Sequence, residues 1–260
     1  MEDLRSDRFR GLYEDGPSWP MDARFSENVR VQDETPNAYQ HLKNLLLNGS
    51  FRAGEHIDLN WAATTIGVSA TPVREALIRL AAERLVTAHP NRGFFYPVPR
   101  AETLADEFRF RFGLSSLCWN SLKRNPIGLE QLRQDADRLH ELQDISEADF
   151  GAVTTALDRS YLTLSKSVHS ACVYREMLAC GERTLVVRRF FVEQRNYRDK
   201  SIENTIDFMH AIMDGDKEGT VFAVTRQLAY DLEEIPIAVE RLRSRSFDSD
   251  GTRLFGADRA

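Results

Sequence analysis

The chain has 260 residues, with 34 Lys and Arg against 40 Asp and Glu, which gives a formal net charge of −6. Its composition, 42% hydrophobic and 28% charged, is that of a globular protein and excludes a disordered chain. Taken as a total, the acidic balance argues against nucleic-acid binding, because domains that bind nucleic acids usually carry a basic surface.

Neither a membrane nor an oxidising compartment is indicated. No apolar stretch reaches the roughly 20 residues that span a bilayer, and the first 30 residues lack the apolar core of a secretory signal. The three cysteines, Cys118, Cys172 and Cys180, stand at unrelated spacings, which predicts neither a disulfide framework nor a CxxC site. We therefore expect a cytoplasmic protein without membrane contact.

Charge and apolar periodicity divide the chain into four segments. Residues 1–35 are polar, carry a net charge of −4 and are interpreted as a flexible N-terminal arm. Residues 36–98 carry +2 and residues 99–243 carry −4, while residues 244–260 are neutral and are expected to form a disordered tail. The acidity therefore belongs to the arm and the third segment, and the second segment keeps a charge compatible with DNA.

The second segment is predicted to form three short helices. Apolar residues recur at three- and four-residue intervals over residues 39–46 and again over residues 59–66. Gly67 then interrupts the pattern, and Ser69 or Thr71 is expected to cap a third helix. The spacing also predicts that Val73, Ala76, Leu77 and Leu80 face the core of this helical trio.

A β-hairpin and a long helical segment are expected to follow. Residues 86–88 and 94–98 predict two short strands around a turn that contains Pro, Asn and Gly. Helical periods then dominate from residue 99 to residue 243, with breaks expected at Pro126, Gly151, Gly181 and Gly215-Asp216. The fold class is therefore mainly α, with a small hairpin and a C-terminal all-helical bundle of about six helices.

The segment from Gly49 to Phe95 resembles the winged helix-turn-helix of the GntR family of bacterial transcription regulators. The likeness includes three ordered motifs, Gly67-Val68-Ser69, Thr71-Pro72-Val73-Arg74-Glu75-Ala76-Leu77 and Asn91-Arg92-Gly93. It implies that the three helices and the hairpin form a winged helix-turn-helix DNA-binding domain over residues 36–98, with the hairpin as its wing.

The residue types agree with this role. A helix that enters the major groove needs small or hydrogen-bonding residues in its first turn and a cation one turn later. The candidate DNA-binding residues are Asn60, Ser69, Thr71, Arg74, Arg92 and Gly93. As an alternative, Arg74 and Arg92 are solvated surface residues. Ala70 stands where family members often carry Arg, which removes one expected base or phosphate contact.

The third segment resembles the FCD effector-binding domain of the FadR subgroup of this family. Many such domains bind a divalent metal through one Asp and three His, the first two of which stand one helical turn apart. The matching positions here hold Asp158, Leu162, Thr205 and Gln227, so the three His are replaced. The resemblance therefore implies an effector-binding and dimerisation domain without a metal or other cofactor.

A metal-free cavity can still bind an effector, as the subgroup's namesake does with an acyl thioester of coenzyme A. The candidate effector-binding residues are Arg111, Asp158, Tyr161, Thr205 and Gln227. A guanidinium such as that of Arg111 suits the carboxylate of a small organic acid, although a packing role for Arg111 is equally open. The run that contains Arg188, Arg189, Arg195 and Arg198 is interpreted as a solvated face or a dimer contact, with binding of an anionic ligand as the alternative.

These features predict a sequence-specific DNA-binding transcription regulator. The favoured form is a ligand-responsive repressor that binds a pseudo-palindromic operator in double-stranded DNA as a homodimer and responds to a small organic-acid or acyl-type effector. One alternative is a regulator of the same fold that senses no small molecule and is constitutive or controlled by a protein partner. A helical-domain enzyme is the remote alternative, because no nucleophile–base pair or phosphate-loop motif is present.

Overall fold

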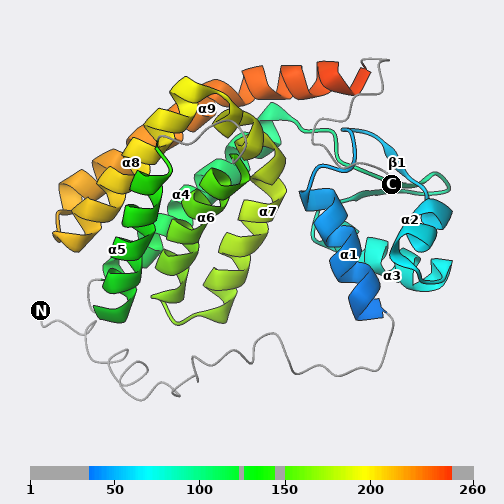
Figure 1. The fold of residues 1–260 in the computed structure, drawn as a ribbon, viewed down its shortest axis with the longest axis horizontal. Helices are drawn as coiled ribbons and strands as arrows, with labels where there is room; N and C mark the ends of the chain where they lie inside the picture. Colours follow the sequence, from blue (N-terminus) through cyan, green and yellow to red (C-terminus); the bar gives the residue numbers. More distant parts are fainter. Residues whose placement is uncertain (1–34, 123–125, 144–149, 248–260) are drawn as a thin grey trace, which may run out of the picture. The chain divides into compact units, whose positions relative to one another are not determined.

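The computed structural model describes residues 35–122, 126–143 and 150–247 (Figure 1). The predicted arm and tail lie outside these residues, apart from Thr35 and residues 244–247, which are helical. The first part of the described chain contains α1 (Thr35–Leu47), β1 (His56–Ile57), α2 (Leu59–Ile66), α3 (Ala70–Ala82), β2 (Thr87–His89) and β3 (Gly93–Phe95).

Helices α1, α2 and α3 share one apolar core. The four residues of α3 that the spacing assigned to the core are fully buried, together with Leu42 of α1 and Ala62 of α2. Helix α2 begins after Asp58, whose carboxylate accepts a hydrogen bond from the backbone N–H of Trp61 at 2.7 Å. It ends at Gly67, whose φ of 81° is a left-handed conformation that allows the tight turn into α3.

The wing belongs to a three-stranded antiparallel sheet with the order β1-β3-β2. The sequence predicted the hairpin of β2 and β3 but not β1, because a two-residue strand leaves no alternating period. The strand predicted for residues 94–98 is also shorter than expected and ends at Phe95. Gly93 has a φ of 92°, and a Cβ there would lie 2.8 Å from His56 Nε2, so a side chain would be strained in β3.

The second part of the described chain consists of helices, which confirms the predicted fold class. Helices α4 and α5 are Ala101–Leu122 and Pro126–Glu141, and the later helices are α6 (Phe150–Lys166), α7 (Ala171–Glu193), α8 (Arg195–Met213) and α9 (Lys217–Phe247). Helix α4 packs against α7 and α9, α6 packs against α5 and α7, and α8 packs against α5 and α9. Across the described segments, no helix combines the length and the apolar character needed to cross a bilayer.

One of the predicted breaks in the helical part is wrong. Pro126 and Gly151 lie in the first turns of α5 and α6, where helices begin as expected, but Gly181 lies in the middle of the continuous helix α7. A Cβ on Gly181 would lie 3.8 Å from both Asp158 Oδ1 and Arg188 Nη2, which is ordinary van der Waals contact, so this glycine faces the ion pair and does not end the helix. The break at Gly215 is confirmed, and the break between α7 and α8 falls instead at Gln194.

Candidate nucleic-acid interface and ligand cavity

The candidate DNA-binding residues of α3 lie on its solvent-exposed side. Ser69, Thr71 and Arg74 are exposed, whereas Val73 and Ala76 on the other side of the helix are fully buried. Ser69 occupies the N-cap position of α3, but its side chain makes no capping hydrogen bond. Its hydroxyl is therefore not used by the helix, and the first turn of α3 presents hydroxyl groups and one guanidinium to solvent.

The remaining candidates come from two other elements. Asn60 is exposed in the first turn of α2, which packs against α3. Arg92 is exposed at the tip of the wing, where its guanidinium carbon lies 5.8 Å from the centre of the Phe95 ring. Gly93 is half-buried, and its clash with His56 on substitution indicates a conformational role in β3. The structure thus offers three separate exposed contact points on one small domain.

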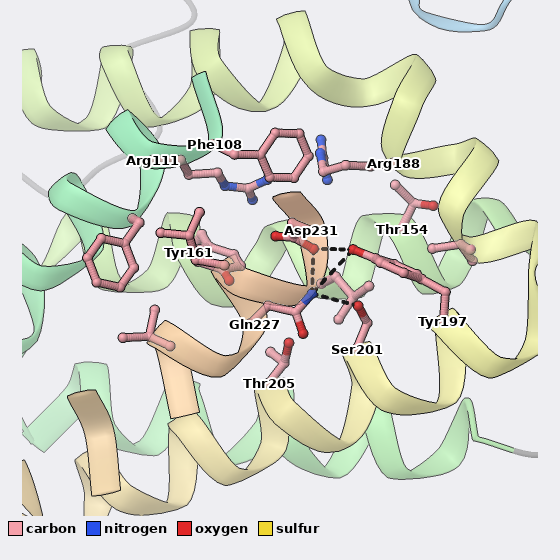
Figure 2. A pocket seen from close by; sticks show the side chains of 15 residues that line it. Phe108, Arg111, Thr154, Tyr161, Arg188, Tyr197, Ser201, Thr205, Gln227 and Asp231 are labelled. Carbon is pink, nitrogen blue, oxygen red and sulfur yellow. Dashed lines mark hydrogen bonds between the residues drawn. The ribbon is translucent and has the colours of Figure 1, made fainter. Parts of the chain in front are cut away.

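A cavity of about 50 Å³ lies among the helices of the second part (Figure 2). Four of the five candidate effector-binding residues line it, namely Arg111, Tyr161, Thr205 and Gln227. In Figure 2 the guanidinium groups of Arg111 and Arg188 enter from one side, and Gln227, Ser201 and Thr205 lie on the other. By volume the cavity holds about three to five water-sized groups, so a ligand that fits it without rearrangement is small.

The fifth candidate, Asp158, forms an ion triad beside the cavity. Its Oδ1 accepts hydrogen bonds from Arg111 Nη2 at 2.6 Å and Arg188 Nη1 at 2.5 Å, and its Oδ2 accepts one from Arg188 Nη2 at 2.8 Å. Burial by itself would raise the pKa of the Asp158 carboxyl, but the charges and hydrogen bonds of the two arginines outweigh it and lower the pKa. The triad carries one net positive charge next to the cavity.

The predicted solvated face around Arg188 is wrong. Arg188 is only 8% exposed, and beyond Asp158 it donates to the carbonyl oxygen of Gly181 at 2.7 Å and to Thr184 Oγ1 at 3.0 Å. Arg198 on α8 is also buried. Arg188 is paired with Asp158 of α6, and Arg198 lies over the Phe150 ring of the same helix, so the local run of arginines does not reveal their burial.

The residues at the family's metal positions do not fit a metal ion. Both oxygens of Asp158 are engaged by guanidinium groups, and Leu162 offers no donor atom. Gln227 uses its side-chain nitrogen to donate to Ser201, Tyr197 and Asp231, and its oxygen accepts from Asn204. Within the described residues there is also no group of three or more His, Cys, Asp and Glu placed to hold a metal.

The sequence did not indicate several polar residues of the cavity, among them Tyr197 and Asp231. The hydroxyl of Tyr197 donates to Asp231 Oδ1, which also accepts from Gln227 Nε2 at 2.7 Å (Figure 2). Burial raises the pKa of Asp231 to about 6, against the effect of these two hydrogen bonds. The sequence contains one signal for this site, because Asp231 is an acidic residue on the otherwise apolar face of α9, four residues after Gln227.

Arg111 retains an unused donor at the cavity. Its Nε is buried and has no hydrogen-bond partner among the described residues, although its Nη2 binds Asp158. An orphaned charged donor is costly unless a ligand or water accepts its hydrogen bond. The guanidinium stacks on the Tyr161 ring at 4.1 Å, and burial raises the pKa of the Tyr161 hydroxyl to about 12, so this hydroxyl stays protonated. The cavity therefore suits a small ligand with a hydrogen-bond acceptor. The net positive charge of the triad favours an anion, whereas the Asp231 carboxylate opposes one when it is ionised above a pH of about 6.

Polar contacts join the helical trio to the helices around the cavity. Lys43 of α1 binds Glu182 of α7 at 2.9 Å, and Arg189 Nη1 donates to the carbonyl oxygen of Leu47 at 2.5 Å. Arg84, two residues after the end of α3, binds Glu107 of α4 at 3.1 Å. Glu182 and Arg189 directly follow Gly181 and Arg188, which lie against Asp158. Helix α7 therefore contacts both the cavity and α1.

The raised pKa of Asp231 predicts a pH dependence of stability. Because the pKa is about 6 in the folded chain and 3.8 in the unfolded chain, the protonated carboxyl favours the fold. This contribution, about 3 kcal/mol, is fully present below pH 4 and is lost as the pH rises through 6. Asp231→Asn preserves both acceptor hydrogen bonds, so its free energy of unfolding should fall less than that of the wild type between pH 4 and 7.

Chemical denaturation at several pH values measures this difference. Asp137→Asn, which changes an exposed carboxylate on α5, serves as the control and should follow the wild-type profile. Identical pH profiles for wild type and Asp231→Asn would contradict the assignment.

Comparison with known proteins supports the interpretation of the first part of the chain. Residues 35–95 match the family model described as bacterial regulatory proteins, gntR family. The Nta operon transcriptional regulator of Aminobacter aminovorans is 46% identical over 61 residues, which are 24% of this chain and 29% of that protein. The HTH-type transcriptional regulator YdhC of Bacillus subtilis is 33% identical over 94 residues, 35% of this chain and 42% of that protein.

The chain thus matches less than half the length of either relative. A wider likeness exists at the level of structure, since McbR/YncC of E. coli superposes with a TM-score of 0.64 at 22% identity, over 80% of this chain and 97% of that one. At this identity the likeness shows a shared fold. With the exposed hydroxyls and guanidinium of α3 and the three-stranded wing, residues 35–95 form a winged helix-turn-helix that is similar to the domain described by the gntR family model.

Proposed function

We propose that the chain is a sequence-specific transcription regulator that acts in the cytoplasm. The observation that carries this proposal is the exposed first turn of α3, with Ser69, Thr71 and Arg74 opposite a fully buried apolar face, in a domain that matches a family of regulatory proteins. Arg92 on the wing and Asn60 on α2 would add contacts to the minor groove and the phosphate backbone. We propose no catalytic role.

We propose further that the chain acts as a homodimer on a pseudo-palindromic operator. An exposed apolar stripe on α4 supports this, because Phe110 is 45% and Leu117 is 56% exposed, and Leu114 lies between them on the same face. Gly113 is central to this stripe, and a Cβ there would meet nothing within 4 Å. A stripe of this kind suits a self-complementary two-fold contact with a second copy, which would match the symmetry of a two-half-site operator.

The cavity supports a ligand-responsive regulator, with a small carboxylic acid as the effector. Its volume is small, the ion triad beside it carries net positive charge, and Arg111 Nε lacks a protein partner among the described residues. A carboxylate oxygen would accept the hydrogen bond of this nitrogen, while the hydroxyls of Tyr161 and Thr205 would bind other polar atoms of the ligand. A regulator without small-molecule sensing stays the alternative, and ligand screening separates the two.

The contacts of α7 and α4 suggest how such a ligand would act on DNA binding. Arg188 faces the cavity, and the next residue, Arg189, binds Leu47 at the end of α1. Arg111 faces the same cavity one turn from Glu107, which binds Arg84 close to the end of α3. A ligand that displaces either arginine would therefore favour a different position of the DNA-binding domain and weaken operator binding, as in a ligand-released repressor.

Arg74→Ala is expected to weaken operator binding by about 1 to 3 kcal/mol and to relax specificity at one base pair if the guanidinium contacts a guanine. The measurement is a binding isotherm against an operator selected from a randomised DNA pool, repeated with single-base variants. Arg195→Ala, which removes an exposed arginine of α8, is the control and should bind like the wild type. Failure of the wild type to enrich any sequence at moderate salt would contradict the proposed function.

A panel of small mono- and dicarboxylic acids is expected to contain at least one compound that raises the thermal midpoint. A ligand at one hundred times its Kd stabilises the fold by about 2.7 kcal/mol. Arg111→Gln should abolish this stabilisation while Asp158 stays paired with Arg188. Arg226→Gln, at a half-buried arginine on α9 that does not line the cavity, should preserve it. Since the site is proposed to work without a metal, dialysis against EDTA should change nothing. Loss of stabilisation after EDTA would contradict the metal-free site.

Glu182→Gln tests the contact between α7 and α1. The substitution releases Lys43 from α7, while Lys43 keeps its bonds to Glu83 and Tyr39. Addition of the stabilising carboxylate should change the operator affinity of the wild type at least fivefold, which is about 1 kcal/mol. The same ligand should change the operator affinity of Glu182→Gln much less. Glu141→Gln, at an exposed ion pair of α5, is the control. An unchanged ligand effect in Glu182→Gln would exclude this contact from the coupling.

A further inference from the structure

The exposed face of α3 contains one large apolar side chain among polar ones. Ile78 is 55% exposed, and Thr71, Arg74 and Glu75 are exposed on the same side of the helix. Seven residues make almost two full turns, so Thr71 and Ile78 lie nearly in line, about 10 Å apart along the helix axis. Ile78 therefore continues the surface that the proposed function assigns to the major groove.

A protein partner is a poor explanation for this exposure. The other large apolar residues with exposed side chains among the described residues lie outside α3, at Val98, Phe110, Leu117, Val221, Phe222 and Ile237. A stable protein interface buries about 800 Å² on each side, which one isoleucine flanked by an arginine and a glutamate does not supply. The surroundings of Ile78 favour a single small apolar contact within a polar surface.

DNA offers such a contact in the major groove. The 5-methyl group of thymine is the apolar group exposed there, and side chains that specify thymine pack against it. The spacing of Thr71, Arg74, Glu75 and Ile78, at positions i, i+3, i+4 and i+7, equals that of the base-contacting residues in homeodomain recognition helices. Because its Cβ is branched, the side chain of Ile78 is nearly fixed in one rotamer on a helix, so little freedom is lost on contact.

We propose that Ile78 reads a thymine by packing against its 5-methyl group. The distance along α3 corresponds to about three base pairs, at 3.4 Å each, between this thymine and the base pair contacted by Thr71. This inference rests on the proposed DNA-binding function and adds a specificity determinant outside the first turns of the helix. Ile78 would recognise this thymine by shape and apolar contact, without a hydrogen bond.

The test removes single methyl groups from the DNA. With the full chain, an operator is selected from a randomised double-stranded pool, and each thymine is then replaced in turn by deoxyuridine. We expect one position in each half-site at which the substitution weakens wild-type binding about fourfold, the effect of one buried methyl group. Ile78→Ala should bind the thymine and deoxyuridine operators at that position equally, because the contact is already absent.

Ile237→Ala is the matched control, since it truncates an isoleucine that is 44% exposed on α9, and it should keep the full sensitivity to deoxyuridine. The same sensitivity in Ile78→Ala as in the wild type, or no sensitive thymine in a selected operator, would overturn the inference and leave the proposed function standing. A change in oligomeric state in Ile78→Ala without any deoxyuridine effect would assign Ile78 to a protein contact and would overturn it as well. Absence of any selected sequence would contradict the proposed function, and the inference with it.

Discussion

The helical part of the chain depends on one half-buried carboxylate. Asp158 binds Arg111 of α4 and Arg188 of α7 from its place on α6, so three helices meet at two oxygen atoms. Removal of Asp158 would leave two buried guanidinium groups without a counter-charge, which is far more costly than the loss of an exposed ion pair. The same two guanidinium groups line or border the cavity and, together with Asp231, determine its electrostatic character.

Most of the DNA-binding domain could be predicted from the sequence because its information is local. The three- and four-residue spacing in α1, α2 and α3 reflects burial on one face, and Gly67 marks a turn that requires a left-handed residue. Strand β1 escaped prediction because two residues carry no period, and its pairing with β3 joins positions almost 40 residues apart. The sequence predicts a helix break at Gly181 because it does not show that Asp158 of α6 lies against this glycine.

The cavity could be predicted only in part. Arg111, Tyr161, Thr205 and Gln227 were found through their positions in a related family, and they converge on one cavity. Arg188 was placed at the surface, since a guanidinium normally stays in water unless a partner compensates its burial. That partner, Asp158, precedes it by 30 residues on another helix. Tyr197 and Asp231 were missed for the same reason, because mutual hydrogen bonds between helices leave no periodic trace.

Neighbouring residues of α7 contact different parts of the chain, and this would restrict how the ligand specificity of the proposed regulator can change. Arg188 belongs to the wall of the cavity and Arg189 to the contact with Leu47, yet they are neighbours on one rigid helix. A substitution that reshapes the cavity for a new ligand, if it tilts or rotates α7, also displaces the guanidinium that holds α1. In the proposed regulator, new ligand specificity would therefore be acquired most readily through cavity residues of α8 and α9, such as Ser201 and Gln227, which hydrogen-bond to each other.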